Sequence, residues 1–419
     1  MFRRNRALVD PVTIQLDGEE LTAERGEPLA LALLASDKSI VARSSKLHRP
    51  RGPSCLRGGC DGCLARVDGV PNVMLCQAPA CGGEHVSSQN VVGSRKADLL
   101  RVTDWFFAKG IDHNHMFAGV PGISSVMQNV AEKVAGLGRL PGAALAERPA
   151  RRLEVDVAVI GGGVAGIAAA ARAAALGRRV ALIDDGVALG GALLGSPRRL
   201  HDLLASCPLG SVEIFSRSVA AGYYDGQILV VTAEPDAVMV RARAFVFATG
   251  AHDGVIAVPG NDLPGVFSAR ALCRILHGGI EPDGPTAIIG DGFWADAVEG
   301  ALGDAPKLRV PAAALVGLRG TGGVRMVELR HEQTGALQTH RVAVVALALP
   351  GAPSFELSTQ AGADTRFDPA LGYAVVTDAR GRFGEKGWAV GECTGVSFDP
   401  DALRVAGERV AGDVAAAIA

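Results

Sequence analysis

The chain has 419 residues, more than one hydrophobic core usually spans, so we expect two or three domains. Its formal net charge is −2, and 48% of its residues are hydrophobic against 21% charged. This composition is typical of a globular protein and gives no electrostatic support for binding nucleic acid or an acidic membrane. The 54 glycines favour tight turns and nucleotide-binding loops.

Neither an export signal nor a membrane span is predicted. The N-terminus carries charges where a signal peptide needs an apolar run, and the longest stretch of low polarity contains Asp156 and Arg172. Five of the eight cysteines lie from Cys55 to Cys81, which is typical of a metal site rather than a disulfide framework. We therefore expect a cytoplasmic protein.

The first predicted elements are a strand over 12–16, a turn at Gly18 and a helix from Leu29. This order is typical of a β-grasp ferredoxin-like domain, which we place over residues 1–104. Amphipathic segments over 105–152 are interpreted as a connector and linker. After them the pattern of strand, glycine turn, helix and strand predicts an α/β fold with a parallel sheet, and a helix follows Asp401 near the C-terminus.

The most specific motif is a cysteine pattern, C-x4-C-x2-C-x12-C, which is the plant-type spacing for a [2Fe–2S] cluster. Its predicted ligands are Cys55, Cys60, Cys63 and Cys76. Glycines between them let the loop wrap closely and direct backbone N–H groups at anionic sulfurs. A zinc site is the alternative, although zinc ribbons usually have two CxxC knuckles and this loop has one. Cys81 is an alternative ligand, but a buried structural thiol is the favoured interpretation.

A dinucleotide site is predicted where the strand EVDVAVI leads into GGGVAG and an Ala-rich helix. The next strand ends in a carboxylate 23 residues after the first glycine of the motif, where it can bind a ribose diol. The pyrophosphate would then sit at the helix N-terminus. The residues of this predicted site are Gly161, Gly163, Val164, Ala165, Gly166 and Asp184.

Three later motifs resemble those of two-dinucleotide-binding flavoproteins and imply FAD rather than NAD. They are a glycine pair after the second strand, an ATG motif, and GWAVGE with the acid that contacts flavin in that family. Val219 matches the position whose backbone holds adenine, although a plain strand residue is an equal alternative. The residues are Gly190, Gly191, Val219, Ala248, Thr249, Gly250, Gly391 and Glu392. The resemblance implies an FAD-binding domain over 153–275 and 346–419, with a shortened NAD-like domain inserted over 276–345.

The inserted segment begins with a second glycine turn, TAIIGDGFWADA, in which Gly290, Gly292 and Ala295 form GxGxxA. The segment is short, and no carboxylate lies over 307–317, where a ribose-binding acid is expected. Trp294 also places bulk beside the turn. NAD(P)H is therefore disfavoured as a substrate.

The two predicted cofactors suit a protein that converts the two-electron oxidation of a substrate into one-electron transfer, because FAD accepts two electrons and a [2Fe–2S] cluster carries one. Disulfide reductase chemistry is disfavoured, because the flavin half has no CxxC or CxxxxC. Cys207, Cys273 and Cys393 are therefore predicted to be structural. His252 and the histidines of IDHNHMF are interpreted as hydrogen-bonding or packing residues, and no catalytic acid or base is predicted.

A closer resemblance, to the N-terminal half of the sarcosine oxidase α-subunit family, is carried by LHRPRGPSCLRGGCDGCLARVDGVPNVMLCQAP, GIDHNHMF, GLGRLP and VPGNDLPGVFSA. Related proteins are subunits of opine, proline and hydroxyproline dehydrogenases and of cyanide synthase. The resemblance implies an electron-relaying chain that assembles with an amino-acid-oxidase-like flavoprotein β subunit, which oxidises a small amine or amino acid. In some members an FMN sits between subunits.

The resemblance does not include the folate-binding C-terminal half, so a folate-coupled reaction is not expected of this chain. Two alternatives stay open at this point. One is a stand-alone NAD(P)H-dependent ferredoxin-type reductase, and the other is a scaffold with a vestigial flavin fold.

Overall fold

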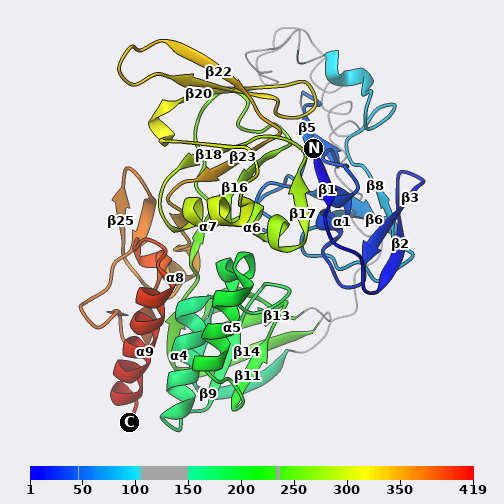
Figure 1. Cartoon of the computed structure of the whole chain (residues 1–419). Helices are drawn as coiled ribbons and strands as arrows, with labels where there is room; N and C mark the ends of the chain where they lie inside the picture. Colours follow the sequence, from blue (N-terminus) through cyan, green and yellow to red (C-terminus); the bar gives the residue numbers. More distant parts are fainter. Residues whose placement is uncertain (46, 103, 105–149, 233–235) are drawn as a thin grey trace, which may run out of the picture. The chain divides into compact units, whose positions relative to one another are not determined.

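The computed structural model describes residues 1–45, 47–102, 104, 150–232 and 236–419 (Figure 1). The predicted connector over 105–152 therefore lies almost wholly outside the described residues. The chain forms two compact units, in which distant segments join. Unit 1 comprises Met1–Ala144, Val255–Asp291 and Val298–Leu347, and unit 2 comprises Leu145–Gly254, Gly292–Ala297 and Ala348–Ala419.

The N-terminal part of unit 1 is the predicted β-grasp, a five-stranded sheet in the order β3-β2-β8-β6-β7 with helix α1. In β2 the side chains of Val12, Ile14 and Leu16 are buried and alternate with more exposed residues, so one face of the sheet joins the core. Its elements are β2 (Pro11–Leu16), β3 (Glu19–Glu24), α1 (Leu29–Ala35), β4 (Ala42–Arg43), β5 (Pro50–Arg51), β6 (Leu64–Val67), β7 (Val70–Met74), β8 (His85–Ser87) and η1 (Leu99–Arg101).

The second part of unit 1 is built on a four-stranded sheet in the order β16-β23-β18-β19. An antiparallel sheet of β20, β21 and β22 is inserted in the chain between β19 and β23. Strands β18 and β23 of the four-stranded sheet are buried throughout and rich in Val, Ile and Ala, as expected of a covered parallel sheet. The elements are β16 (Val266–Ser268), α6 (Ala269–His277), β17 (Ile280–Pro282), β18 (Thr286–Gly290), α7 (Phe293–Leu302), β19 (Lys307–Val310), η3 (Ala312–Ala314), β20 (Leu315–Arg319), β21 (Met326–Arg330), β22 (Leu337–Arg341) and β23 (Val344–Ala348).

Two strand pairings tie this second part to its surroundings in unit 1. Strand β16 falls inside the range predicted for the FAD domain, yet it pairs in parallel with β23. Strand β1 (Phe2–Arg4) pairs antiparallel with β17, and the rings of Phe2 and Phe267 meet edge to face at 5.5 Å between centroids. Unit 1 therefore groups the ferredoxin-like part with residues 255–291, and the predicted domain boundaries stay predictions.

Unit 2 contains the larger sheet, in which β11, β10, β9 and β14 run side by side and β14 continues to β13 and β12. The C-terminal half of β14 pairs with β28, whereas its N-terminal half pairs with β13. The elements are β9 (Arg151–Ile160), α4 (Val164–Ala175), β10 (Val180–Ile183), η2 (Gly191–Gly195), α5 (Pro197–Ser206), β11 (Val212–Phe215), β12 (Val219–Tyr224), β13 (Gln227–Val231), β14 (Ala237–Phe247), β15 (Ala251–His252), β24 (Ala352–Pro353), α8 (Glu356–Gln360), β25 (Thr365–Asp368), β26 (Gly372–Val375), β27 (Arg382–Phe383), β28 (Gly387–Ala389), η4 (Glu392–Thr394) and α9 (Pro400–Ala417).

The two faces of this sheet bury separate hydrophobic cores. Val157 and Val159 of β9 pack with residues of α4 and α9, whereas Ala158 and Ile160 pack into the cluster on the opposite face. Helices α4 and α9 lie side by side (Figure 1). Gly407 makes this possible, because a Cβ there would lie 2.3 Å from the Ala165 carbonyl oxygen. Among the described residues, no helix is long and apolar enough to cross a membrane.

Candidate functional site

The four predicted cluster ligands are brought together in unit 1, where Cys55, Cys60 and Cys63 lie between β5 and β6 and Cys76 follows β7. Their thiols form a connected string of side-chain contacts, Cys60 to Cys55, Cys55 to Cys76, and Cys76 to Cys63. Cys55, Cys63 and Cys76 are buried, and Cys60 is half-buried. Cys55 and Cys60 form one pair of thiols, Cys63 and Cys76 form the other, and the contact between Cys55 and Cys76 joins the two pairs. This arrangement suits two irons that each take two thiolates. Among the described residues, no three or more His, Cys, Asp or Glu side chains are placed around one metal ion, so the fit to a two-iron cluster rests on the pairwise thiol contacts and on the cysteine spacing.

Backbone N–H groups point at these sulfurs, as the glycine content of the loop predicts. The Arg57 N–H donates to Cys55 Sγ at 3.5 Å and the Gly58 N–H to Cys76 Sγ at 3.3 Å. Gly58 has φ +77°, a conformation that favours glycine. A Cβ on Gly62 would lie 2.3 Å from the Gly52 carbonyl oxygen. The loop is therefore folded tightly enough that only glycine fits at this position.

Mutual contact and burial raise the pKa of ligand thiols in this loop, so these thiols ionise when a cation is bound. Contact with Cys55, and then burial, raises the pKa of Cys60 well above its usual range. For Cys76, contact with Cys55 lowers the pKa, but contact with Cys63 together with burial outweighs it and raises the pKa to about 12. Four thiols crowded in a poorly solvated site become thiolates when metal binding displaces their protons, so the donor set fits a [2Fe–2S] cluster.

The first glycine turn in unit 2 has the close packing that a dinucleotide site requires. Gly161 has φ +103°, and a Cβ on it would lie 2.2 Å from the Ala248 carbonyl oxygen. A Cβ on Gly166 would lie 1.8 Å from the Gly161 carbonyl oxygen, so helix α4 can start directly against the turn. A Cβ on Gly163, the N-cap of α4, would meet no atom within 4 Å, which leaves space for a ligand at the helix N-terminus.

The predicted ribose-binding acid, Asp184, lies directly after β10 and is buried. One carboxylate oxygen accepts the Gly162 N–H at 2.5 Å and the other accepts the Gly186 N–H at 2.9 Å. These bonds fix the carboxylate against the glycine turn. The chemistry and place of this group fit the ribose of a dinucleotide.

The later motifs converge on the same edge of the sheet. The Gly190 N–H donates to the Gly162 carbonyl at 2.7 Å, and a Cβ on Gly191 would lie 3.0 Å from Gly163 Cα. Ala248 follows β14 and its N–H donates to the Ile160 carbonyl at 2.7 Å. The glycine pair and the ATG motif therefore both lie against the GxGxxG turn.

The GWAVGE segment also reaches this edge. Gly391 has φ +91°, and a Cβ on it would lie 3.3 Å from Ala165 Cβ. Glu392 is buried at the start of η4. Cys393 beside it contacts the Phe247 carbonyl, and burial raises the pKa of its thiol to about 11, so it is a structural cysteine as predicted. Val219, the first residue of β12, is 51% exposed.

Thr249 and His252 belong to a short segment that crosses toward β24. The Thr249 hydroxyl donates to the Ser354 carbonyl at 2.6 Å, and the Ser354 N–H donates to the Gly250 carbonyl at 3.0 Å. His252 is exposed, and its Nε2 lies 4.0 Å from Glu356 Oε1. This separation is longer than a hydrogen bond, and His252 belongs to the short strand β15, so its interpretation as a hydrogen-bonding loop residue stays a prediction.

The prediction that Cys81 is a buried thiol is wrong, because the residue is exposed. It follows Ala80 at the end of the loop, where the backbone N–H groups of Cys81 and Gly82 bind the Glu84 carboxylate. Cys273 is buried as predicted, and burial raises its pKa to about 12. The histidines of IDHNHMF lie outside the described residues.

The second glycine turn, between β18 and α7, matches the first at its first glycine, where Gly290 has φ +107°, but differs at the next, where Gly292 has φ +86° and Gly163 has φ −79°. Trp294 is buried, and its ring lies 4.9 Å from Phe293 and 4.8 Å from Phe398 between centroids. At the end of this turn Asp291 pairs with Arg309 of β19 at 3.3 Å. An arginine therefore faces this turn from the neighbouring strand.

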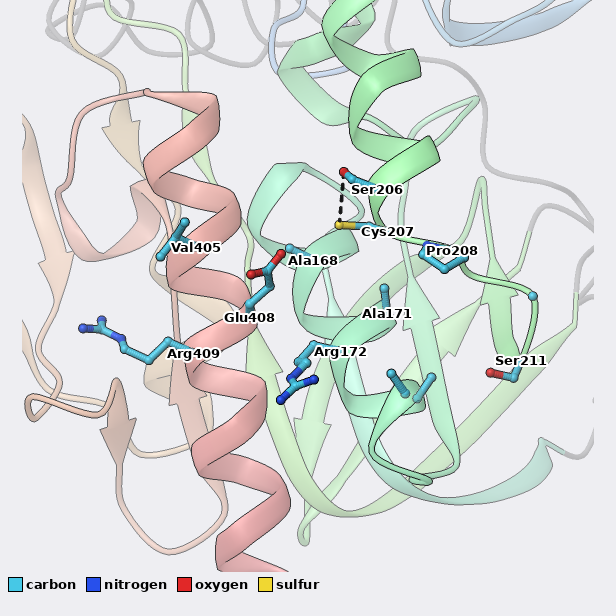
Figure 2. A pocket seen from close by; sticks show the side chains of 13 residues that line it. Ala168, Ala171, Arg172, Ser206, Cys207, Pro208, Ser211, Val405, Glu408 and Arg409 are labelled. Carbon is cyan, nitrogen blue, oxygen red and sulfur yellow. Dashed lines mark hydrogen bonds between the residues drawn. The ribbon is translucent and has the colours of Figure 1, made fainter.

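A cavity of about 810 Å³ lies between α4, the end of α5 and α9 (Figure 2). Ala168 and Ala171 form part of its wall, with Cys207 and Ser206 at one side. None of the residues predicted to bind FAD lines it, so we do not assign it to the flavin.

Sequence reasoning missed the residues of 262–274 that contact the cluster loop from outside the ferredoxin-like domain. The Ser268 N–H donates to the Ser54 carbonyl at 3.1 Å, and Arg274 Nη1 donates to the Leu56 carbonyl. The only signal was the motif VPGNDLPGVFSA, which covers the start of this segment but carries no cysteine.

Comparison with known proteins supports both cofactor sites. Residues 9–91 match the family described as 2Fe-2S iron-sulfur cluster binding domain, and residues 155–301 match Pyridine nucleotide-disulphide oxidoreductase. The alpha chain of sarcosine oxidase from Rhizobium meliloti is 29% identical over 68% of this chain and 32% of its own length. One of the opine oxidase subunits of Agrobacterium tumefaciens is 35% identical over 39% of this chain and 38% of its own length.

Two solved structures share the fold. L-proline dehydrogenase from P. horikoshii aligns with a TM-score of 0.73 and 22% identity, over 98% of this chain and 75% of that one. Lactococcus lactis thioredoxin reductase aligns with a TM-score of 0.51 and 18% identity, over 63% of this chain and 99% of that one. The β-grasp domain and the two-dinucleotide-binding flavoprotein fold are thereby confirmed.

These matches, the string of four thiols and the packed glycine turn define an iron–sulfur flavoprotein oxidoreductase, with FAD and a [2Fe–2S] cluster as its cofactors. Within this class, the chain is similar to sarcosine oxidase α subunits and to opine oxidase subunits A. It spans about a third of the length of the curated relatives it matches first.

Proposed function

We propose that this chain is the electron-relaying subunit of a heteromeric amine or amino-acid dehydrogenase or oxidase. Its partner would be an amino-acid-oxidase-like flavoprotein β subunit that oxidises a secondary or primary amine of the sarcosine or proline type. An FMN at the subunit interface is consistent with this assembly. We expect the complex in the cytoplasm, where reducing conditions keep the ligand thiols free of disulfides.

The observation that carries the proposal is the presence of both cofactor sites in one chain. The thiol string of unit 1 supplies four ligands, and the turn of unit 2 supplies a helix N-terminus with Asp184 beside it. When bound, FAD takes two electrons together and the [2Fe–2S] cluster passes them on singly. Names of relatives also favour amine donors, since they include sarcosine oxidase and opine oxidase subunits.

The protein's own residues have defined tasks in this scheme. Backbone N–H groups of Arg57 and Gly58 stabilise ligand sulfurs, while the N-terminus of α4 accepts the pyrophosphate. Asp184 holds the turn and binds the ribose diol, and Val219, Gly391 and Glu392 complete the predicted FAD contacts. The cysteines outside the cluster loop leave no thiol pair for disulfide chemistry at the flavin, since Cys207, Cys273 and Cys393 are buried and distant in sequence.

The test is purification of the native complex under anaerobic conditions, followed by iron, sulfide and flavin analysis and identification of its subunits. We expect two irons, two sulfides and one FAD per chain, together with a second flavoprotein encoded beside it. The variant Cys76→Ser should lose labile sulfide and keep FAD, because its site lies in unit 1 and the flavin turn in unit 2. Zinc without sulfide, or a chain that copurifies with no flavoprotein, would contradict the proposal.

A further inference from the structure

The cluster loop is held from outside the ferredoxin-like domain by one continuous segment, residues 262–274. Arg51 Nη1 pairs with Asp262 Oδ2 at 2.5 Å, directly before the loop begins. Ser268, the N-cap of α6, donates its backbone N–H to the Ser54 carbonyl at 3.1 Å. Three residues around the first ligand are therefore tied to this segment, because Arg274 also donates to the carbonyl of Leu56.

Arg274 differs from the other two contacts because it brings a charge close to the ligand sulfurs. It lies on α6, and Leu56, which accepts its hydrogen bond, directly follows Cys55. Burial lowers the pKa of Arg274, while the Cys76 and Cys55 sulfurs raise it and the nearby Arg57 lowers it. An arginine stays protonated in proteins, so this guanidinium is a fixed positive charge beside the cluster ligands.

A fixed positive charge in a poorly solvated site has a direct effect on one-electron chemistry. Reduction adds one unit of negative charge to the cluster and its four thiolates, and no bond is made or broken. A neighbouring cation stabilises the reduced form more than the oxidised form, and low local polarity strengthens the effect. Solvent screening is limited here, because Arg274 is mostly shielded and its partner Leu56 is buried.

We propose that Arg274 is a positioning residue for the [2Fe–2S] cluster, which fixes the ligand loop through Leu56 and raises the cluster's reduction potential by its charge. The inference rests on the proposed function only in requiring that the cluster is present. It gives helix α6 a role in electron transfer that is independent of nucleotide binding. In this role α6 raises the reduction potential of the [2Fe–2S] cluster, which accepts electrons from the flavin.

The experiment is an EPR-monitored redox titration of the full chain, with dithionite as reductant and mediators, for three variants. Arg274→Gln keeps an N–H donor for the Leu56 carbonyl but removes the charge. We expect its equilibrium constant for one-electron reduction to fall about tenfold, which is a potential about 59 mV more negative. Arg274→Lys keeps the charge and should stay within about twofold of wild type.

Arg309→Gln is the matched control, because it removes another arginine of unit 1, one whose charge is already paired with Asp291 and Glu299. It should leave the potential unchanged. An Arg274→Gln protein with full iron and sulfide and a wild-type potential would overturn the inference. If Arg274→Gln cannot hold the cluster, Arg274→Lys decides, and a tenfold shift in that charge-conserving variant would equally overturn it. Absence of labile sulfide in the wild-type chain would instead contradict the proposed function.

Discussion

The two glycine turns of this protein begin with the same backbone conformation and then differ. Their first glycines, Gly161 and Gly290, have φ values of +103° and +107°, but at the next motif glycine φ is −79° at Gly163 and +86° at Gly292. In the first turn the third motif position is Gly166, where no Cβ fits. In the second it is Ala295, a buried residue with a Cβ, so α7 cannot approach its turn as closely as α4 does.

The charges beside the two turns also differ in sign. A buried carboxylate, Asp184, accepts two N–H groups at the first turn. At the second, Arg309 reaches Asp291 and Glu299 from the neighbouring strand, and Trp294 packs among aromatic rings. The comparison teaches that a GxGxx motif specifies a strand–turn–helix corner, whereas ligand binding depends on the third position and on the next strand. The following predictions test whether the third motif position and the next strand determine ligand binding, starting with the largest expected effect.

Replacement of Gly166 by Ala should abolish FAD binding. The new Cβ would lie 1.8 Å from the Gly161 carbonyl oxygen, so helix α4 would have to move away from the turn. We expect the flavin-to-protein absorbance ratio after gel filtration to fall to less than about a tenth of wild type. The matched control is Ala295→Gly at the second turn, which should keep its full flavin content. Equal flavin loss in both variants would contradict the comparison.

Asp184→Asn should weaken FAD binding without unfolding the chain. In the proposed site this carboxylate binds the ribose diol, and a hydrogen bond to a charged group contributes about 1.5–3 kcal/mol, so affinity should fall about 10- to 100-fold. Fluorescence titration of the flavin-free protein with FAD measures this change. The control variant Asp291→Asn, which removes a carboxylate of the second turn, is expected to leave the affinity unchanged.

NADH and NADPH should not bleach the bound flavin. The second turn lacks a ribose-binding carboxylate over residues 307–317, and the bulky Trp294 lies directly after it. Anaerobic stopped-flow mixing at millimolar NADH measures flavin absorbance directly, with dithionite as the positive control. Rapid bleaching would favour the alternative of a stand-alone ferredoxin-type reductase.

Arg309→Gln should have the smallest effect. Its ion pairs with Asp291 and Glu299 lie in a half-exposed position, where such pairs contribute about 0–1 kcal/mol. We expect a change of a few degrees at most in the thermal midpoint measured by circular dichroism, and no change in flavin content. A loss of several kcal/mol would show that this turn is held together by its charges.

Much of the fold follows from local pattern. The alternating apolar residues of β2, the buried run of β9 and the glycine turn before α4 each carry their own signal. The cluster ligands and the GxGxxG turn can be named from spacing, whereas the later glycines of the flavin site are named from their resemblance to flavoprotein motifs, and the structure brings each set together. Local chemistry determines these contacts, because ligands of one loop are close in sequence.

The remaining features depend on contacts between residues far apart in sequence. The pairing of β16 with β23 and of β1 with β17 cannot be predicted from either strand alone. Strands β1, β16 and β17 are three residues long, which is too short for their sequence to specify a pairing partner. Arg274 likewise lies 218 residues from its acceptor Leu56. The exposure of Cys81 differs from the prediction because cysteines are usually buried, whereas here the Glu84 carboxylate binds the backbone of a surface turn.

The pairing of Phe2–Arg4 with Ile280–Pro282 has a consequence for synthesis on the ribosome. At about 5–20 residues per second, the N-terminal strand emerges on the order of 15–60 s before its partner has been translated. During that interval Asp262, Ser268 and Arg274 have not yet been translated. The nascent ferredoxin-like region therefore has its ligand thiols but lacks the contacts that these three residues make with the cysteine loop. Iron–sulfur assembly is therefore expected to follow translation of residues 262–274 rather than that of the cysteine loop alone.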